Sequence, residues 1–210
     1  MLIFTDTGAD LPKEYYEEAN VIPFPLSVEI DGATYQDVFE MDGPTLYEAI
    51  KNGAQPKTSQ VSPETFLTAF EAAAKAGEES IYISFSGALS GTYSTAVMIR
   101  NQVLETYPDM KLYTVDSKCA SFAQGLVIKE AVRLRDEGKS VEEVVAAVEA
   151  YASKMNHIFT VDDLNFLARG GRLSKTSALF GGMLNIKPIL SLQDGKLVPI
   201  DKIRGQKKAI

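Results

Sequence analysis

The sequence of 210 residues contains a single cysteine, Cys119, and a single histidine, His157. One cysteine excludes an intramolecular disulfide and a zinc site built from several cysteines, and it fits a reducing compartment. One histidine excludes a metal site with several histidine ligands, and a Ser-His-Asp or Cys-His catalytic group would have to use His157. We expect His157 to be a buried, hydrogen-bonded side chain and Cys119 to be a small core residue.

Long apolar runs are missing as well. No stretch reaches the roughly 20 residues that a membrane-spanning helix needs. The first six residues, MLIFTD, lack both the basic region and the long apolar core of a secretory signal peptide. The sequence therefore predicts a cytoplasmic protein without a membrane span.

The overall composition is that of a globular protein, with 45% hydrophobic and 23% charged residues. The net charge of −7 repels phosphate backbones, so we expect no nucleic-acid partner. The segment from Arg169 to Lys208 is different, because it holds nine basic and two acidic residues. This segment is either a solvated face or a docking surface for an anionic group or an acidic partner.

Short apolar runs alternate with amphipathic segments over residues 1–155. Strand-helix alternation with short connections indicates parallel strands joined by right-handed crossovers. The fold class predicted here is α/β, with an N-terminal parallel-sheet domain over 1–155. We expect strands near 2–5, 81–85 and 111–115, an irregular extended segment at 21–30, and helices near 42–52, 62–77, 92–107, 121–138 and 140–154.

The pattern changes near residue 155. Residues 157–161 have the composition of a strand, 162–168 that of a short helix, and 186–203 that of a hairpin with Asp194-Gly195 at its turn. We therefore expect residues 156–210 to be the start of a second, α+β domain. A unit of this size is small for independent stability, so we expect this domain to be truncated or completed by a partner.

The loop Ser86–Thr92 is rich in glycine and hydroxyl groups and lies between a predicted strand and a predicted helix. In open α/β sheets, ligands bind where strands end in such loops, and the free N–H groups of a helix start can bind an anion. The loop lacks the Gly-Lys-Ser/Thr run of a nucleotide-binding phosphate loop. An uncharged loop of this kind suits a single carboxylate, although simple helix capping is the alternative. Thr58-Ser59-Gln60 supplies a second set of polar groups.

Asp6-Thr7-Gly8 matches the triplet of aspartic proteases, which need two such carboxylates. The triplet occurs once in this sequence, so a protease is not expected. Asp6 and Asp116 each end a predicted strand, and two interpretations stay open for them. They either cap turns at the edge of the sheet, or they serve an enzyme that acts on a small phosphorylated or carboxylated metabolite at the Ser86–Thr92 loop.

A series of short motifs occurs in one order along the whole chain and resembles the DegV family of bacterial fatty-acid-binding proteins. The motifs are Asp6-Thr7-Gly8-Ala9-Asp10, Lys57-Thr58-Ser59-Gln60, Leu89-Ser90-Gly91-Thr92-Tyr93, Asp116-Ser117, Leu167-Ala168-Arg169-Gly170-Gly171-Arg172-Leu173-Ser174 and Lys202-Ile203-Arg204-Gly205. Each motif alone is weak, whereas their common order is specific.

The resemblance implies a long-chain fatty acid, such as palmitate, stearate or oleate, buried between two domains. It implies that Thr58 and Ser90 hold the carboxylate, and we expect the amides of Gly91 and Thr92 beside them. Arg172 and Arg204 match residues of the head-group or partner surface.

The resemblance also implies a role for the chain as a whole. It describes a carrier subunit and not an enzyme, with no cofactor and no metal, whose bound carboxylate is phosphorylated by an ATP-dependent fatty acid kinase subunit. Family members continue further and contain a His-x-Gly-Pro-Gly element that this chain lacks.

Overall fold

The computed structural model describes residues 1–161, 164–173 and 186–205. Its central sheet has the strand order β2-β1-β6-β7, and every neighbouring pair is parallel. The strands are β1 (Leu2–Asp6), β2 (Val21–Phe24), β6 (Ser80–Ser84) and β7 (Leu112–Asp116). The predicted α/β class is therefore confirmed, and the carboxyl ends of the four strands share one edge of the sheet.

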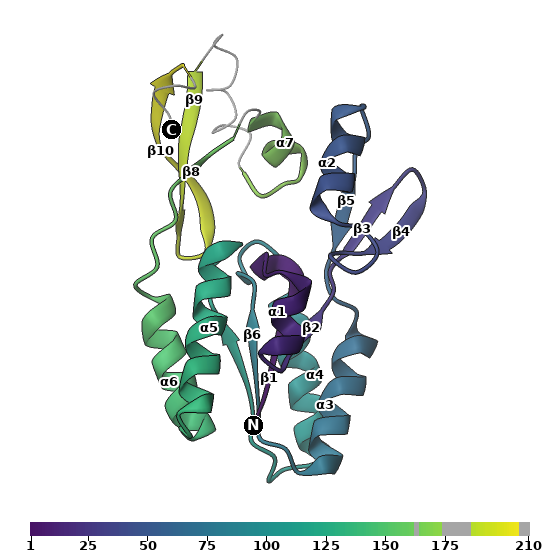
Figure 1. The fold of residues 1–210 in the computed structure, drawn as a ribbon, viewed down its shortest axis with the longest axis vertical. Coiled ribbons are helices and arrows are strands. Elements are labelled where there is room, and N and C mark those ends of the chain that lie inside the picture. The colour runs from purple at the N-terminus through teal and green to yellow at the C-terminus, as the bar shows by residue number, and fades with distance from the viewer. Residues whose placement is uncertain (162–163, 174–185, 206–210) are drawn as a thin grey trace.

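Helices cover both faces of this sheet (Figure 1). On one side lie α3 and α4, and on the other α5 and α6. Their bounds, with those of the short helices η1 and α1, are η1 (Thr7–Ala9), α1 (Lys13–Glu18), α3 (Pro63–Ala76), α4 (Thr92–Thr106), α5 (Phe122–Asp136) and α6 (Val141–Ala152).

Successive residues of each central strand point to opposite faces of the sheet and pack into two separate hydrophobic cores. Ile3 and Ile81 pack with the helices α5 and α6, whereas Phe4 and Tyr82 pack with α3 and α4. The second core is mainly aromatic, since the rings of Phe4, Phe24, Phe66, Phe70 and Tyr82 stack or meet edge to face. Burial on both faces explains why these strands are continuous apolar runs in the sequence.

Helix ends follow the capping signals in the sequence. Ser62 accepts a hydrogen bond from the Thr65 amide at the start of α3, and Gly77 ends that helix with φ +68°. Ser140 and Glu143 form a capping box at the start of α6. Asp42 caps α2 (Gly43–Lys51) through the Thr45 amide. The predicted helix boundaries are confirmed at these positions, because local side chains satisfy the otherwise free N–H groups.

A small antiparallel sheet with the order β4-β3-β5 stands beside the carboxyl edge of the parallel sheet (Figure 1). It consists of β3 (Ser27–Ile30), β4 (Ala33–Gln36) and β5 (Lys57–Ser59). Thr58 lies opposite Val28 in the pairing of β5 with β3. No strand was predicted at Thr58, because a strand of three exposed residues has no apolar alternation.

A third sheet with the order β10-β9-β8 lies beyond the carboxyl ends of the parallel strands (Figure 1). Its strands are β8 (Phe159–Thr160), β9 (Ile186–Gln193) and β10 (Lys196–Arg204), and α7 (Leu164–Arg169) packs beside them. The predicted hairpin is confirmed, with Asp194 and Gly195 both at positive φ in its turn. Leu164, Leu173 and Leu190 form its buried core.

The hairpin turn contacts the loop Ser86–Thr92. The Ser86 hydroxyl donates a buried hydrogen bond of 2.8 Å to the Gly195 carbonyl, and Lys118 Nζ lies 3.8 Å from a carboxylate oxygen of Asp194. A Cβ on Gly195 would lie 2.3 Å from Ser86 Oγ, so only glycine permits this approach. The two parts of the chain therefore meet directly at the loop that was singled out in the sequence.

Candidate functional site

The Ser86–Thr92 loop follows β6 and ends at the start of α4. Ser90 Oγ and Thr92 Oγ1 lie 2.8 Å apart, and the Thr92 amide donates to Ser90 Oγ at 3.2 Å. Gly91 is the residue that caps the helix. Ser90, Gly91 and Thr92 are thus gathered at a helix N-terminus, where the backbone favours an anion.

Gln60 approaches the same loop from the segment after β5. Its Nε2 donates to Thr95 Oγ1 at 2.8 Å, and a Cβ on Gly91 would lie 2.1 Å from its Oε1. Glycine at position 91 therefore lets the Thr58-Ser59-Gln60 segment lie against the start of α4. This contact joins the two polar sets that the sequence placed on separate segments.

A cavity of about 350 Å³ brings these elements together. Thr58, Ser59, Gln60 and Ser90 lie on its wall, whereas Gly91 and Thr92 stand behind Ser90 and do not line it. The rest of the wall is largely apolar and comes from the loops after β2, β6 and β7, from α7 and the turn after it, and from β10. Those lining residues are Leu26, Phe85, Leu89, Ala120, Phe166, Leu167, Gly170, Arg172 and Leu197.

Leu89 and Leu167 of the apolar lining lie within motifs of the sequence, whereas the rest of that lining was not predicted. Leu26 lies between two short strands, and Leu197 is one of several apolar residues of a hairpin. Such residues carry no local signal of a site, because their common position depends on the packing of the third sheet against the first. Motifs therefore indicated the polar side and only part of the apolar side of the cavity.

Arg172 lines the cavity, and its guanidinium donates hydrogen bonds to two backbone carbonyls. Its Nε donates to the Leu89 carbonyl at 3.0 Å, and a terminal nitrogen donates to the Gly170 carbonyl. Both the glycine turn and the loop that carries Ser90 are therefore attached to this one side chain. These bonds favour a positioning role for Arg172.

Arg204 is exposed near the end of β10 and does not line the cavity. It lies seven residues beyond Leu197, which corresponds to ~20 Å along a strand. The structure does not bring the two predicted arginines together, and the role of Arg204 at a partner surface stays a prediction. Lys175, Lys207 and Lys208 of the basic segment lie outside the described residues.

Asp6 is fully buried and accepts hydrogen bonds from four donors. They are the Tyr82 hydroxyl at 2.7 Å, the Phe85 amide at 2.8 Å, the Gly8 amide at 3.1 Å and Gln124 Nε2 at 3.2 Å. Burial nevertheless raises the pKa of Asp6 above its ordinary value. Asp116 accepts from the amides of Gly87 and Lys118. Both carboxylates hold loops at the edge of the sheet, which favours the turn-capping interpretation.

Cys119 and His157 show no sign of nucleophilic or acid-base activation. Cys119 is buried, and burial raises the pKa of its thiol to about 11. His157 accepts a hydrogen bond from the Ala120 amide through Nε2 at 3.4 Å, and burial lowers the pKa of its imidazole.

Among the residues that the structure describes, no three His, Cys, Asp or Glu side chains form a metal-binding group. No helix of the described part is long and apolar enough to span a bilayer.

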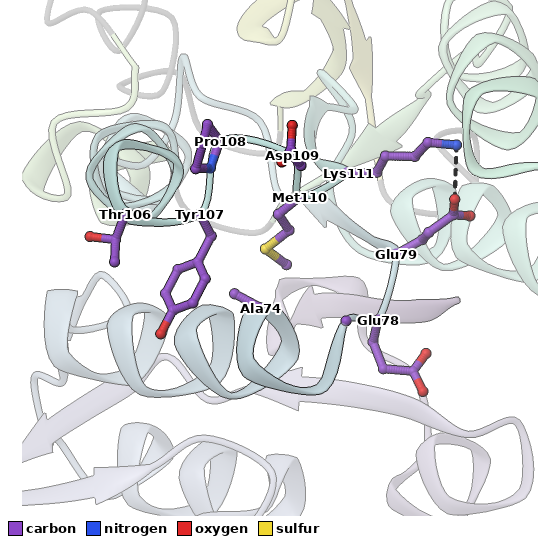
Figure 2. A pocket seen from close by; sticks show the side chains of 10 residues that line it. Ala74, Glu78, Glu79, Thr106, Tyr107, Pro108, Asp109, Met110 and Lys111 are labelled. Carbon is purple, nitrogen blue, oxygen red and sulfur yellow. Dashed lines mark ion pairs between the residues drawn. The ribbon is translucent and has the colours of Figure 1, made fainter.

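A cavity of about 500 Å³ lies at the opposite, amino-terminal edge of the parallel sheet. Figure 2 shows Tyr107 and Met110 directed toward Ala74 of α3, with Glu79 paired to Lys111 at the rim. None of the predicted site residues lies there. The smaller cavity with Thr58 and Ser90 is therefore the candidate site.

The whole chain, residues 1–210, matches the family model described as uncharacterised protein, DegV family. The chain belongs to the DegV family. It is 41% identical to the DegV domain-containing protein YteA of Lactococcus lactis over 99% of this chain and 73% of that protein. It is 40% identical to the DegV domain-containing protein CPE0026 of Clostridium perfringens over 100% of this chain and 73% of that protein.

Solved structures of family members are also similar. A stearic acid-binding protein from Eubacterium ventriosum matches with a TM-score of 0.91 and 31% identity over 100% of this chain and 73% of its own. The fatty acid-binding DegV of Bacillus subtilis matches with a TM-score of 0.86 and 33% identity over 99% and 73%. The fatty acid kinase B3 protein of Streptococcus pneumoniae, loaded with linoleic acid, matches with a TM-score of 0.84 and 30% identity over 100% and 75%.

Proposed function

We propose that this DegV protein binds a long-chain fatty acid in the cavity between the parallel sheet and the third sheet. The carboxylate accepts hydrogen bonds from the Thr58 and Ser90 hydroxyls, and the acyl chain lies against the apolar wall. The observation that carries this proposal is the division of one cavity into a hydroxyl-bearing side and an apolar side. Fatty acids have the same division between head group and tail.

The energetics suit a carboxylate with a long tail. Each buried CH₂ contributes about 0.8 kcal/mol, so the tail supplies most of the affinity. Hydrogen bonds from neutral groups to a charged acceptor contribute about 1.5–3 kcal/mol each. The start of α4 adds a favourable field for one negative charge. The Thr58 and Ser90 hydroxyls and the start of α4 therefore determine that the carboxylate end of the ligand faces the Ser86–Thr92 loop.

We further propose that the chain is a carrier subunit in the bacterial cytoplasm, where a partner kinase phosphorylates the bound carboxylate. A carboxylate oxygen attacks the γ-phosphorus of ATP, the bond to the β-phosphate oxygen breaks, and an acyl phosphate and ADP result. The similarity to the pneumococcal fatty acid kinase B3 protein supports this role. The chain itself contributes binding and orientation, with Arg172 and Arg204 assigned to the head-group or partner surface.

Extraction of the purified protein followed by mass spectrometry tests the binding function. We expect about one palmitate, stearate or oleate per chain, and displacement of it by added linoleate. A protein that carries no fatty acid and takes up none would contradict the proposal. Turnover of a small phosphorylated or carboxylated metabolite without a kinase would support the enzyme alternative at the same loop.

A further inference from the structure

Thr92 belongs to the motif that carries Ser90, yet it does not line the candidate cavity. Its side chain is fully buried at the start of α4. A buried hydroxyl needs a hydrogen-bond partner, because an unpaired polar group in the protein interior costs free energy. The partner of the Thr92 hydroxyl therefore indicates what this side chain does.

That partner is Ser90. Thr92 Oγ1 lies 2.8 Å from Ser90 Oγ, and the Thr92 amide donates to the same serine oxygen at 3.2 Å. Within the described part of the chain, the Thr92 hydroxyl makes no other hydrogen bond. If Ser90 were the donor in the pair of hydroxyls, the proton of Thr92 would be buried without an acceptor. Thr92 is therefore the donor, and Ser90 Oγ is the acceptor.

The hydrogen bonds of Thr92 determine how Ser90 can interact with a ligand. A serine hydroxyl has two lone pairs and one proton. Thr92 occupies both lone pairs of Ser90 Oγ, one with its amide and one with its hydroxyl. The proton of Ser90 is left for the cavity, since Ser90 lines the cavity wall. Ser90 thus presents a donor to the cavity and has no free lone pair for a donor on a ligand.

We propose that Thr92 is a positioning residue that makes the site selective for a head group that only accepts hydrogen bonds. This inference rests on the proposed function and adds the origin of its head-group selectivity. An ionised carboxylate accepts and never donates, whereas an alcohol also carries a proton to donate. Linked hydrogen bonds polarise one another, so the bond from Thr92 also strengthens the bond that Ser90 donates.

The other hydroxyl of the site does not carry this selectivity. Thr58 is exposed on the short strand β5, so its hydroxyl can rotate between donating and accepting. It can bind an alcohol as well as a carboxylate. Discrimination between the two head groups therefore depends on Ser90 and, through it, on Thr92.

Binding of palmitate and of 1-hexadecanol to the delipidated protein tests this selectivity, because the two ligands have equally long chains and different head groups. The wild type should bind palmitate about 10–100-fold more tightly, the equivalent of one hydrogen bond to a charged group. Thr92→Val should weaken palmitate binding about 2–10-fold, the equivalent of one neutral hydrogen bond. Its affinity for hexadecanol should hardly change, because Ser90 gains a lone pair for the proton of the alcohol. Thr92→Ser keeps the hydroxyl and should restore the preference for palmitate.

A double-mutant cycle shows whether Thr92 acts through Ser90. In a Ser90→Ala background, Thr92→Val should cause no further loss of palmitate affinity. Thr114→Val is the matched control, because it also removes a hydroxyl with a hydrogen bond, here one that accepts from Arg100 at 3.0 Å, and lies outside the cavity wall. It should leave both affinities unchanged. Equal losses from Thr92→Val in the two backgrounds would show a general structural effect and overturn the proposal.

Neutron diffraction from the deuterated, ligand-free wild type tests the donor assignment without a variant or a ligand. The deuterium between the two hydroxyl oxygens should be bonded to Thr92 Oγ1. A deuterium bonded to Ser90 Oγ on that line would overturn the proposal even if the protein binds palmitate. Equal wild-type affinities for palmitate and hexadecanol would contradict the selectivity alone, whereas a wild type that binds neither ligand would contradict the proposed function itself.

Discussion

The parallel sheet and the third sheet are stabilised to very different degrees. The parallel sheet is covered on both faces by two large cores, one of them a cluster of five aromatic rings. The described part of the third sheet has a core of three buried leucines, and β10 is largely exposed. Since the described core of the third sheet is the smaller one, we expect its stability to depend more on its contacts with the rest of the chain.

Those contacts converge on the loop that carries Ser90. The third sheet and its neighbouring turn bind this loop through Ser86 with Gly195 and through Leu89 with Arg172. In the described part of the chain, loops of the parallel sheet and strand β5 position the polar side of the cavity, and a sheet with a small core contacts them there. Such an arrangement lets a cavity open at low cost, since regions with few buried apolar contacts open locally first.

The largest effect is expected in the aromatic core beside the parallel sheet. Phe70→Ala should lower the free energy of unfolding by about 3–5 kcal/mol, because it leaves a cavity within the aromatic core. Leu190→Ala should instead increase hydrogen exchange in β9 and β10 while exchange in β1 and β6 stays slow. Hydrogen exchange with mass spectrometry measures both variants. Uniform exchange changes after Leu190→Ala would show that the two sheets unfold as one unit.

The polar half of the cavity provides the next test. Thr58→Ala combined with Ser90→Ala should weaken fatty-acid binding at least tenfold, since each lost hydrogen bond to a charged group costs about 1.5–3 kcal/mol. The Tm of the ligand-free form should hardly change. Thr34→Ala combined with Thr68→Ala, two exposed hydroxyls outside the cavity, is the control for isothermal titration with oleate. Unchanged affinity in the Thr58 and Ser90 variant would place the carboxylate elsewhere.

Attachment of the hairpin turn can be broken with one methyl group. Gly195→Ala combines a strained positive φ with a Cβ 2.3 Å from Ser86 Oγ. Gly32→Ala, at φ +81° in another hairpin turn, has no atom within 4 Å of the new Cβ. Backbone strain of about 1–2 kcal/mol is common to both. Only Gly195→Ala should therefore reduce fatty-acid affinity, and equal effects in the two variants would contradict a role for this contact.

Much of the part that contains the parallel sheet could be predicted from the sequence. Ser62-Pro63, Gly77 and the capping box at Ser140 determine helix ends through bonds to neighbouring residues. The strand at Thr58 was missed because its pairing with Val28 depends on a partner distant in the sequence. Apolar lining residues outside the motifs were missed for the same reason. Short sequence motifs identified Ser90 and Thr58 as candidate site residues. Leu26 and Phe166, in contrast, line the cavity only because of tertiary packing.

Arg172 and Arg204 give the smallest and most selective effect. Arg172 binds the Leu89 carbonyl beside Ser90, so Arg172→Ala should weaken fatty-acid binding about 2–10-fold, the equivalent of one net hydrogen bond. Lysine has no planar fork, so Arg172→Lys should restore little of the loss.

Arg204→Ala should leave affinity unchanged, because Arg204 is exposed and distant from the cavity. Both alanine variants should reduce kinase-dependent acyl-phosphate formation, Arg204→Ala through the partner surface alone. Affinity, Tm and acyl phosphate measured on the same preparations distinguish the two roles. Loss of affinity in Arg204→Ala would contradict a role for Arg204 at the partner surface alone, and unchanged affinity in Arg172→Ala would make Arg172 a residue that acts on the partner.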